Sequence, residues 1–108
     1  MPSVEAAGLT INYDVQGAGE PLLLIPYTGA DHACYAFQLP AYTEHFQCIS
    51  VDLPGTGESS KPAGPYSTEV HADQLAAFMD AIEVERAHVA GVSLGAAIAM
   101  HLAWWPTP

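Results

Sequence analysis

The chain has 108 residues, of which 50% are hydrophobic and 13% are charged. This length fits one domain, and so apolar a composition excludes disorder, collagen and coiled coils. Twelve acidic residues against two basic ones give a formal net charge of −10, which repels phosphate backbones and anionic lipid headgroups. Composition therefore predicts one folded domain that binds no nucleic acid.

Both ends of the sequence bear on where the protein resides. Residues 1–8 lack the basic and apolar regions of a secretory signal, so we expect a cytoplasmic protein. Residues 87–108 contain no Asp, Glu, Lys or Arg, and their length would permit a membrane span. Glycines and His101 within this segment, and the lack of flanking basic residues, argue against membrane association, which is kept as an alternative. Cys34 and Cys48 are expected to be free thiols, because so apolar a domain needs no disulfide.

Four segments have the patterns of β-strands. Residues 9–15 alternate so that Leu9, Ile11, Tyr13 and Val15 share one face, which is typical of a half-buried strand. Short apolar runs at residues 21–26, 46–51 and 87–90 predict strands that are buried on both faces.

Three segments between and after these strands have helical patterns. Residues 32–45 predict a helix interrupted by Pro40. Residues 68–84 predict a second helix with Ser67 as its N-cap, and residues 94–105 a third that is apolar nearly all round. Strands that alternate with helices predict an α/β fold, in which helices flank a mostly parallel sheet.

The most informative motif is Gly-Val-Ser-Leu-Gly at residues 91–95, between the last predicted strand and the last predicted helix. A G-x-S-x-G turn in this context is the nucleophile elbow, where a sharp turn strains the serine and the glycines let strand and helix approach. It predicts Ser93 as a nucleophile at a helix N-terminus and the backbone N–H of Leu94 as an oxyanion donor. The alternative is a glycine-rich turn in which Ser93 only caps the helix.

With this motif, the chain resembles the N-terminal portion of the α/β-hydrolase superfamily, in its serine-nucleophile branch, over nearly all its length. Residues 52–60, Asp-Leu-Pro-Gly-Thr-Gly-Glu-Ser-Ser, look like the family's D-x-x-G-x-G-x-S turn. The resemblance implies a structural role for this turn and no catalytic one. A dinucleotide site is disfavoured, because Ser60 stands where the third glycine belongs and no helix pattern follows.

Residues 24–29, Leu-Ile-Pro-Tyr-Thr-Gly, look like the segment where the family usually carries His-Gly-x-Gly. The resemblance implies that the backbone N–H of Thr28 completes the oxyanion hole with Leu94. Two residues depart from the family pattern, since Pro26 replaces the histidine and Tyr27 replaces the first glycine.

A serine nucleophile needs a base and an orienting carboxylate, which in the family follow it in the chain. No acid follows Ser93, and the only later histidine is His101, about 12 Å along the helix. His88 lies about 16 Å before the serine along a strand. His32, just past the segment that resembles the oxyanion loop, is the one histidine expected near the site. The favoured alternative is that it is an ordinary surface or helix-start residue. The five histidines show no metal-ligand spacing, so no metal or cofactor is predicted.

The resemblance implies that residues 1–108 are part of a single α/β-hydrolase domain, truncated after the helix that follows the elbow. Such a serine hydrolase would act on a small carboxylic ester, lactone, thioester or amide through an acyl-serine intermediate. Without a base and an acid, we expect this chain alone to be inactive. The alternative is a non-catalytic half-fold that binds partners or self-associates through its exposed sheet edge.

Overall fold

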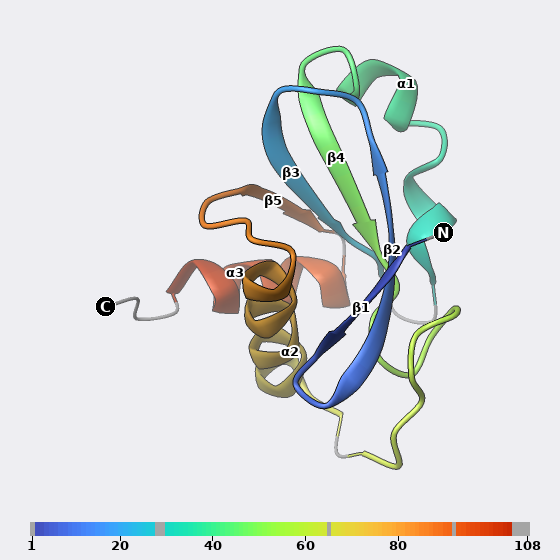
Figure 1. The fold of residues 1–108 in the computed structure, drawn as a ribbon, viewed down its shortest axis with the longest axis vertical. Helices are drawn as coiled ribbons and strands as arrows, with labels where there is room; N and C mark the ends of the chain where they lie inside the picture. Colours follow the sequence, from blue (N-terminus) through green and yellow to red (C-terminus); the bar gives the residue numbers. More distant parts are fainter. Residues whose placement is uncertain (1, 28–29, 65, 92, 105–108) are drawn as a thin grey trace.

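The structure is a computed structural model that describes residues 2–27, 30–64, 66–91 and 93–104. One sheet runs through it in the order β1-β2-β4-β3-β5 (Figure 1). Its strands are β1 (Ser3–Ala6), β2 (Leu9–Gln16), β3 (Glu20–Ile25), β4 (Phe46–Val51) and β5 (His88–Gly91). β3 is parallel to β4 and to β5, whereas β2 is antiparallel to β1 and to β4. This mixed sheet confirms the predicted α/β class.

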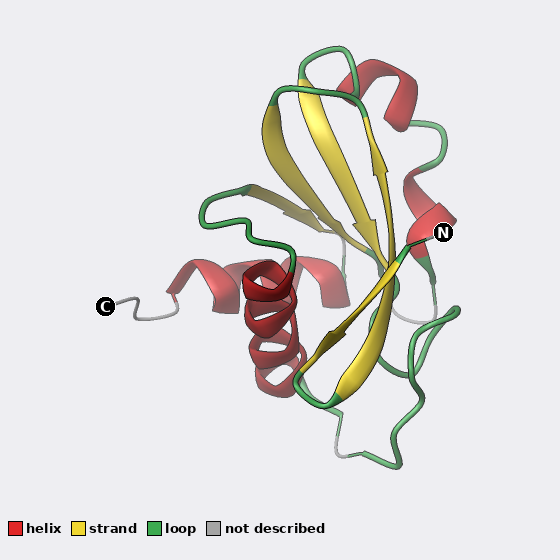
Figure 2. Cartoon of the chain, viewed as in Figure 1, coloured by secondary structure: helices red, strands yellow, loops and turns green. Residues whose placement is uncertain are grey.

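Helices cover both faces of the sheet (Figure 2). α2 (Thr68–Ala81) and α3 (Leu94–Trp104) lie on one face, and η1 (His32–Tyr35), a 3-10 helix, and α1 (Leu39–Tyr42) lie on the other. Successive residues of β3 alternate between the two layers. Leu23 and Ile25 pack with Phe78 of α2 in the larger core, while Leu22 and Leu24 pack with the smaller group around η1.

The sequence pattern did not predict β1, which forms a hairpin with β2 through a two-residue turn. Ala7 and Gly8 at the tip have φ of 52° and 75°, as the tight turns that suit the twist of paired strands require. Ala6 is buried in the larger core. Four residues are too few for the alternation to have been recognised in the sequence alone.

The helix predicted over residues 32–45 is interrupted as expected, but the break comes before Pro40, because the segment divides into η1 and α1 with a turn between them. Pro40 stands in the first turn of α1, the place in a helix where the missing N–H of proline costs nothing. The second predicted helix ends earlier than expected, at Ala81 rather than residue 84. Ser67 is confirmed as its N-cap, since its side chain accepts a hydrogen bond from the Val70 amide.

The structure also bears on the cysteines and on the apolar C-terminal segment. Cys34 and Cys48 are both free, as predicted. α3 begins at Leu94 as expected, while Trp105, the predicted last residue of that helix, lies outside the described residues. In the described part of the chain, no helix has both the length and the hydropathy that crossing a bilayer requires.

Candidate functional site

The carboxyl ends of the three parallel strands meet at one edge of the sheet. In the pairing register, Leu24 of β3 lies beside Ser50 of β4, and Ile25 lies beside Gly91 of β5. The segments that follow these strands therefore share this edge, which is where open α/β sheets bind ligands. Ser93, Leu94 and Thr28 all belong to these segments, although Thr28 lies outside the described residues.

Ser93 has an unusual backbone at the junction of β5 and α3. Its φ is 58°, in the left-handed region that residues with a side chain rarely adopt. Its carbonyl accepts the first hydrogen bond of α3, from the Ala97 amide at 3.1 Å, and its side chain is exposed. Strain of this kind persists only where the surrounding structure imposes it.

Two glycines explain how the turn at Ser93 can be so sharp. A Cβ on Gly91 would overlap the backbone of Gly95, and a Cβ on Gly95 would overlap the carbonyl oxygen of Ile25. The first turn of α3 thus packs directly on the ends of β5 and β3. Both glycines are needed for this close approach, as the sequence predicted.

Ser67 and Ser93 both precede helices, but only Ser67 has the backbone and the hydrogen bond of a helix N-cap. Ser67 is a conventional N-cap with an extended backbone, φ −158°, and its Oγ accepts the Val70 amide at 3.0 Å. Ser93 has the opposite sign of φ, and its Oγ makes no hydrogen bond to any residue that the structure describes. The capping interpretation therefore fits Ser67 and does not account for the geometry of Ser93.

The histidines are spread over the molecule. His88 lies at the amino end of β5, opposite Leu22, where its Nε2 is 2.6 Å from a carboxylate oxygen of Glu20. His71 is buried on α2 and hydrogen-bonded to Gln74 at 3.1 Å. None of the histidines in the described part of the chain is hydrogen-bonded to Ser93.

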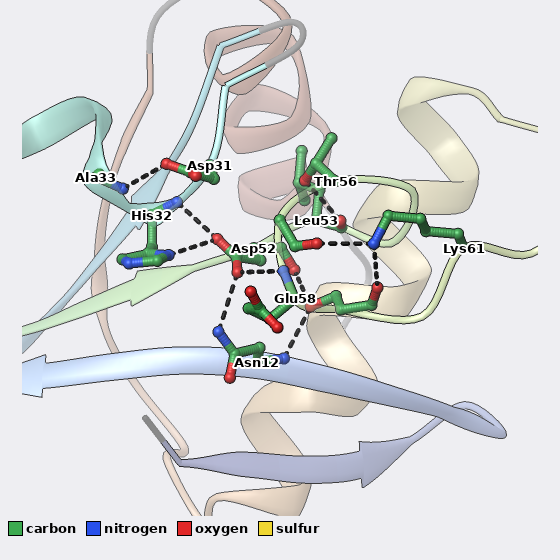
Figure 3. A network of polar contacts seen from close by, with 11 residues as sticks. Asn12, Asp31, His32, Ala33, Asp52, Leu53, Thr56, Glu58 and Lys61 are labelled. Atoms are coloured by element: carbon green, nitrogen blue, oxygen red, sulfur yellow. Dashed lines mark hydrogen bonds and ion pairs between the residues drawn. The ribbon is translucent and has the colours of Figure 1, made fainter.

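His32 makes a contact that the sequence did not reveal. Its backbone N–H and its ring Nδ1 both lie close to Oδ1 of Asp52, at 2.7 and 2.8 Å (Figure 3). The second oxygen of that carboxylate accepts the side-chain amide of Asn12 at 3.0 Å and the backbone amide of Glu58 at 2.9 Å. One buried carboxylate thereby connects β2, the segment after β3 and the segment after β4.

The environment of Asp52 keeps it ionised. Its side chain is completely buried, and burial raises the pKa of a carboxyl group. The hydrogen bonds from Glu58, Asn12 and His32 outweigh burial and leave the pKa of Asp52 below its ordinary value. The sequence signal for this network was an aspartate directly after a buried strand, since a buried carboxylate needs partners. The sequence could not say which residues they are.

Asp31, His32 and Asp52 have ligand-type atoms that all lie within 4.8 Å of one another. Hydrogen bonds account for this cluster. Each oxygen of Asp52 accepts two of them, and Asp31 accepts the Ala33 amide at 2.9 Å as the N-cap of η1. We therefore assign no metal to these side chains.

Two open hollows lie at the amino ends of the parallel strands β3, β4 and β5, away from Ser93. The larger, about 600 Å³, is lined in part by Tyr13, Gln47 and Val84, and the smaller, about 380 Å³, by Glu20 and His88. Pro21 and Arg86 line both. Because they are at the opposite edge of the sheet, neither can present a substrate to Ser93.

Comparison with known proteins agrees with this arrangement. A family model described as the alpha/beta hydrolase fold matches residues 21–104. The chain is 37% identical over 103 residues to a putative carbamate hydrolase, RutD, of Azorhizobium caulinodans, and 34% identical over 102 residues to 2-hydroxymuconate semialdehyde hydrolase of a Pseudomonas species. Among solved structures, Est816, described as an N-acyl homoserine lactone degrading enzyme, superimposes with a TM-score of 0.86 at 38% identity.

These matches cover most of the chain but only part of each relative. They span 95% and 91% of the chain against 39% and 36% of the two hydrolases, and 94% of the chain against 39% of Est816. The chain therefore spans less than half the length of these proteins. The family match at residues 21–104 runs from β3 to α3 and includes the turn at Ser93.

Proposed function

The chain belongs to the α/β-hydrolase family, and from this we propose that it carries the nucleophile of a serine hydrolase. Ser93 is the proposed nucleophile, and the backbone N–H of Leu94, with that of Thr28, forms the proposed oxyanion hole. The substrate class is a small carboxylic ester, lactone, thioester or amide. The location that we propose is the cytoplasm.

The observation that carries this proposal is the left-handed backbone of Ser93 between two glycines that have no room for a side chain. A structure does not maintain such strain for a helix cap, which Ser67 provides with an ordinary backbone. The relatives support a hydrolytic reaction, because they are described as a carbamate hydrolase, a semialdehyde hydrolase and a lactone-degrading enzyme.

The chemistry follows from the position of the serine. Oγ of Ser93 attacks the carbonyl carbon of the substrate, its proton passes to a base, and the carbonyl oxygen becomes an oxyanion. The N–H groups at the start of α3 favour that negative charge. The tetrahedral species collapses to an acyl-serine and releases the alcohol, thiol or amine with a proton. Water then cleaves the acyl-serine, releasing the carboxylic acid and restoring the hydroxyl.

Labelling with a fluorophosphonate tests the nucleophile. The probe is far more reactive than an ester and reports a single attack, so we expect Ser93 to be labelled slowly in the 108-residue chain, through its position at the helix N-terminus alone, and Ser93→Ala to give no adduct at this position. Peptide mapping locates the adduct. A label on Ser59, Ser60 or Ser67 in place of Ser93 would contradict the assignment.

Turnover is a separate matter. No Asp or Glu follows Ser93 in this sequence, and removing triad members costs several orders of magnitude in rate. We therefore expect the purified chain to hydrolyse p-nitrophenyl acetate no faster than Ser93→Ala. Clear turnover that depends on Ser93 would show that a base is present within the chain, with His32, His45 and His71 as the residues to test.

A second candidate function is a non-catalytic module that binds a partner or a second copy. β5 supports it, because in the described sheet this strand pairs with β3 alone and stands at the edge. The labelling experiment separates the two candidates, since a binding module has no reason to activate Ser93.

A further inference from the structure

Tyr27 is an exposed aromatic residue at the carboxyl edge of the sheet. It is 47% exposed, although Pro26, the residue before it, is fully buried. In the described part of the chain, its ring belongs to neither core and makes no contact with another aromatic ring. The packing of the described residues therefore does not account for a large side chain at this position.

The backbone of Tyr27 lies beside the first turn of α3. Ile25 is paired with Gly91 in the sheet, so β3 and β5 end next to each other. A Cβ on Gly95 would lie 2.9 Å from the carbonyl oxygen of Pro26. That oxygen belongs to the peptide group that joins Pro26 to Tyr27, and this peptide group therefore lies against the helix turn.

Hydrogen bonds hold the backbone of Tyr27 in this place. Its carbonyl accepts a hydrogen bond from the Ala30 amide at 2.9 Å. Burial raises the pKa of the Cys34 thiol, and a hydrogen bond from the backbone of Tyr27 opposes this rise. Since Cys34 belongs to η1, Tyr27 is attached to the layer on one face of the sheet while its peptide group lies against a helix of the other.

The backbone conformation of Tyr27 does not dictate which residue stands there. Among the described residues other than glycine, those with positive φ are Ala7, Glu83 and Ser93. Tyr27 therefore has a backbone that any residue with a side chain adopts, although it stands where the family pattern has a glycine. Its side chain is free to be replaced without strain in the backbone, which makes the role of the ring testable.

Tyr27 and Ser93 are exposed on the same edge of the sheet. Ser93 precedes Gly95 by two residues, and Gly95 is the residue that the peptide group before Tyr27 contacts. A substrate whose carbonyl carbon is attacked by Oγ of Ser93 lies over this edge, beside the tyrosine. An aromatic ring in such a place offers apolar area and a π-face against which another ring stacks.

From this placement we propose that Tyr27 is a specificity-determining residue, whose ring packs against an aromatic group of the substrate close to the carbonyl that Ser93 attacks. The role rests on the proposed serine hydrolase function. It narrows the substrate class to carboxylic acid derivatives that carry an aromatic ring near the carbonyl. Tyr27 touches the substrate and transfers no proton.

Two sulfonyl fluorides that differ by one phenyl group test this role in the 108-residue chain. Methanesulfonyl fluoride and phenylmethanesulfonyl fluoride both sulfonylate serine. Oγ forms a bond to sulfur, the S–F bond breaks, fluoride leaves and the hydroxyl proton passes to water. The measured quantity is the ratio of the two modification rates at Ser93, phenyl over methyl, from peptide mapping at successive times. Contact with the phenyl group changes this ratio, whereas a distorted turn slows both reagents alike.

Three variants are compared with the wild type. Tyr27→Ala removes the ring, and Tyr27→Phe keeps the ring without its hydroxyl. Phe37→Ala is the control, because it removes an aromatic side chain that is 96% exposed between η1 and α1, on the face of the sheet opposite α3. We expect the rate ratio to fall about two- to tenfold in Tyr27→Ala, which is the range for a contact between two aromatic rings. Tyr27→Phe and Phe37→Ala should keep the wild-type ratio.

The outcomes separate the two proposals. If Ser93 is modified but Tyr27→Ala keeps the wild-type ratio, the role of Tyr27 is overturned while the nucleophile stands. The same holds if Tyr27→Phe or Phe37→Ala loses as much as Tyr27→Ala, because the aromatic face of Tyr27 is then not what the phenyl group contacts. If neither reagent modifies Ser93 in the wild type, the serine hydrolase function fails and the role of Tyr27 fails with it.

Discussion

Gly95 lies so close to Ile25 that a Cβ on the glycine would overlap the carbonyl oxygen at the end of β3. That carbonyl also accepts the hydroxyl of Tyr35 from the helical layer on the opposite face. One peptide group thus joins α3, the sheet and η1, immediately beside the turn that carries Ser93. The geometry of the turn at Ser93 therefore depends on the contact between Gly95 and Ile25, and a substitution at Gly95 tests it directly.

Gly95→Ala should destabilise the protein. In an ordinary helix this substitution would stabilise by up to about 1 kcal/mol, but here the added methyl meets backbone atoms that cannot rotate away. We expect the free energy of unfolding to fall by about 1–3 kcal/mol, as in other overpacked sites. Urea unfolding measures the change. Ala97→Ser, at an exposed position of the same helix, should stay within about 0.5 kcal/mol of the wild type.

Glu83→Gly should have the opposite effect. α2 ends in a Schellman motif, in which the amides of Glu83 and Val84 donate to the carbonyls of Asp80 and Met79 at 3.1 and 2.9 Å. Glu83 has φ of 61°, a conformation that glycine adopts without steric cost. We expect a gain of about 0.5–1 kcal/mol in unfolding free energy. Glu85→Gly, just beyond the motif, is the matched control and should not stabilise.

The sequence predicted those features of the fold that depend on neighbouring residues. The strand over residues 46–51 was predicted with its observed bounds, because its apolar run ends at Asp52. Ser67 was predicted as a cap, and α3 was predicted to begin at Leu94. The glycines around Ser93 were predicted to allow a close approach, because glycine spacing in a strand-to-helix turn has a steric meaning of its own.

Features that depend on distant residues were not predictable in the same way. His32 and Asp52 are 20 positions apart, and only the pairing of β3 with β4 brings them together. The division of residues 32–45 into η1 and α1 likewise reflects packing, since Tyr35, Leu39 and Tyr42 all contact the smaller core. Helical periodicity cannot distinguish two short helices from one helix with a proline. The roles of Ser93, Leu94 and Thr28 stay predictions.

Protonation of His71 should lower the free energy of unfolding in mild acid. Burial lowers the pKa of its ring, and the hydrogen bond to Gln74 offsets this only in part. The unfolded chain therefore binds the proton more strongly than the folded one, so stability is complete above about pH 6.5 and decreases as the pH falls below that value. His71→Gln should reduce the loss of unfolding free energy between pH 7.5 and 5. At pH 8, where His71 is neutral in both the folded and the unfolded wild type, the difference between variant and wild type measures the packing contribution alone. An unchanged pH slope would contradict the prediction.

The 108-residue chain should self-associate, because of its charge distribution and the order of its strands. β5 has a neighbour on one side only in the described sheet, so its other side offers backbone donors and acceptors to a second strand. In α3, which packs against β5, Met100 is 73% exposed, and residues 87–104 carry no Asp, Glu, Lys or Arg. On a molecule with a net charge of −10, this neutral and apolar region is where two copies repel each other least.

We expect sedimentation velocity at micromolar concentration to show dimers or larger species, with strong binding of the dye ANS. His88→Lys, which places a fixed charge at the exposed position of β5, should shift the population toward monomer. Glu69→Lys, at an exposed position on α2, also makes the net charge less negative and should not. A wild-type chain that sediments as a monomer, unfolds cooperatively and binds no dye would show that β5 is not an association edge.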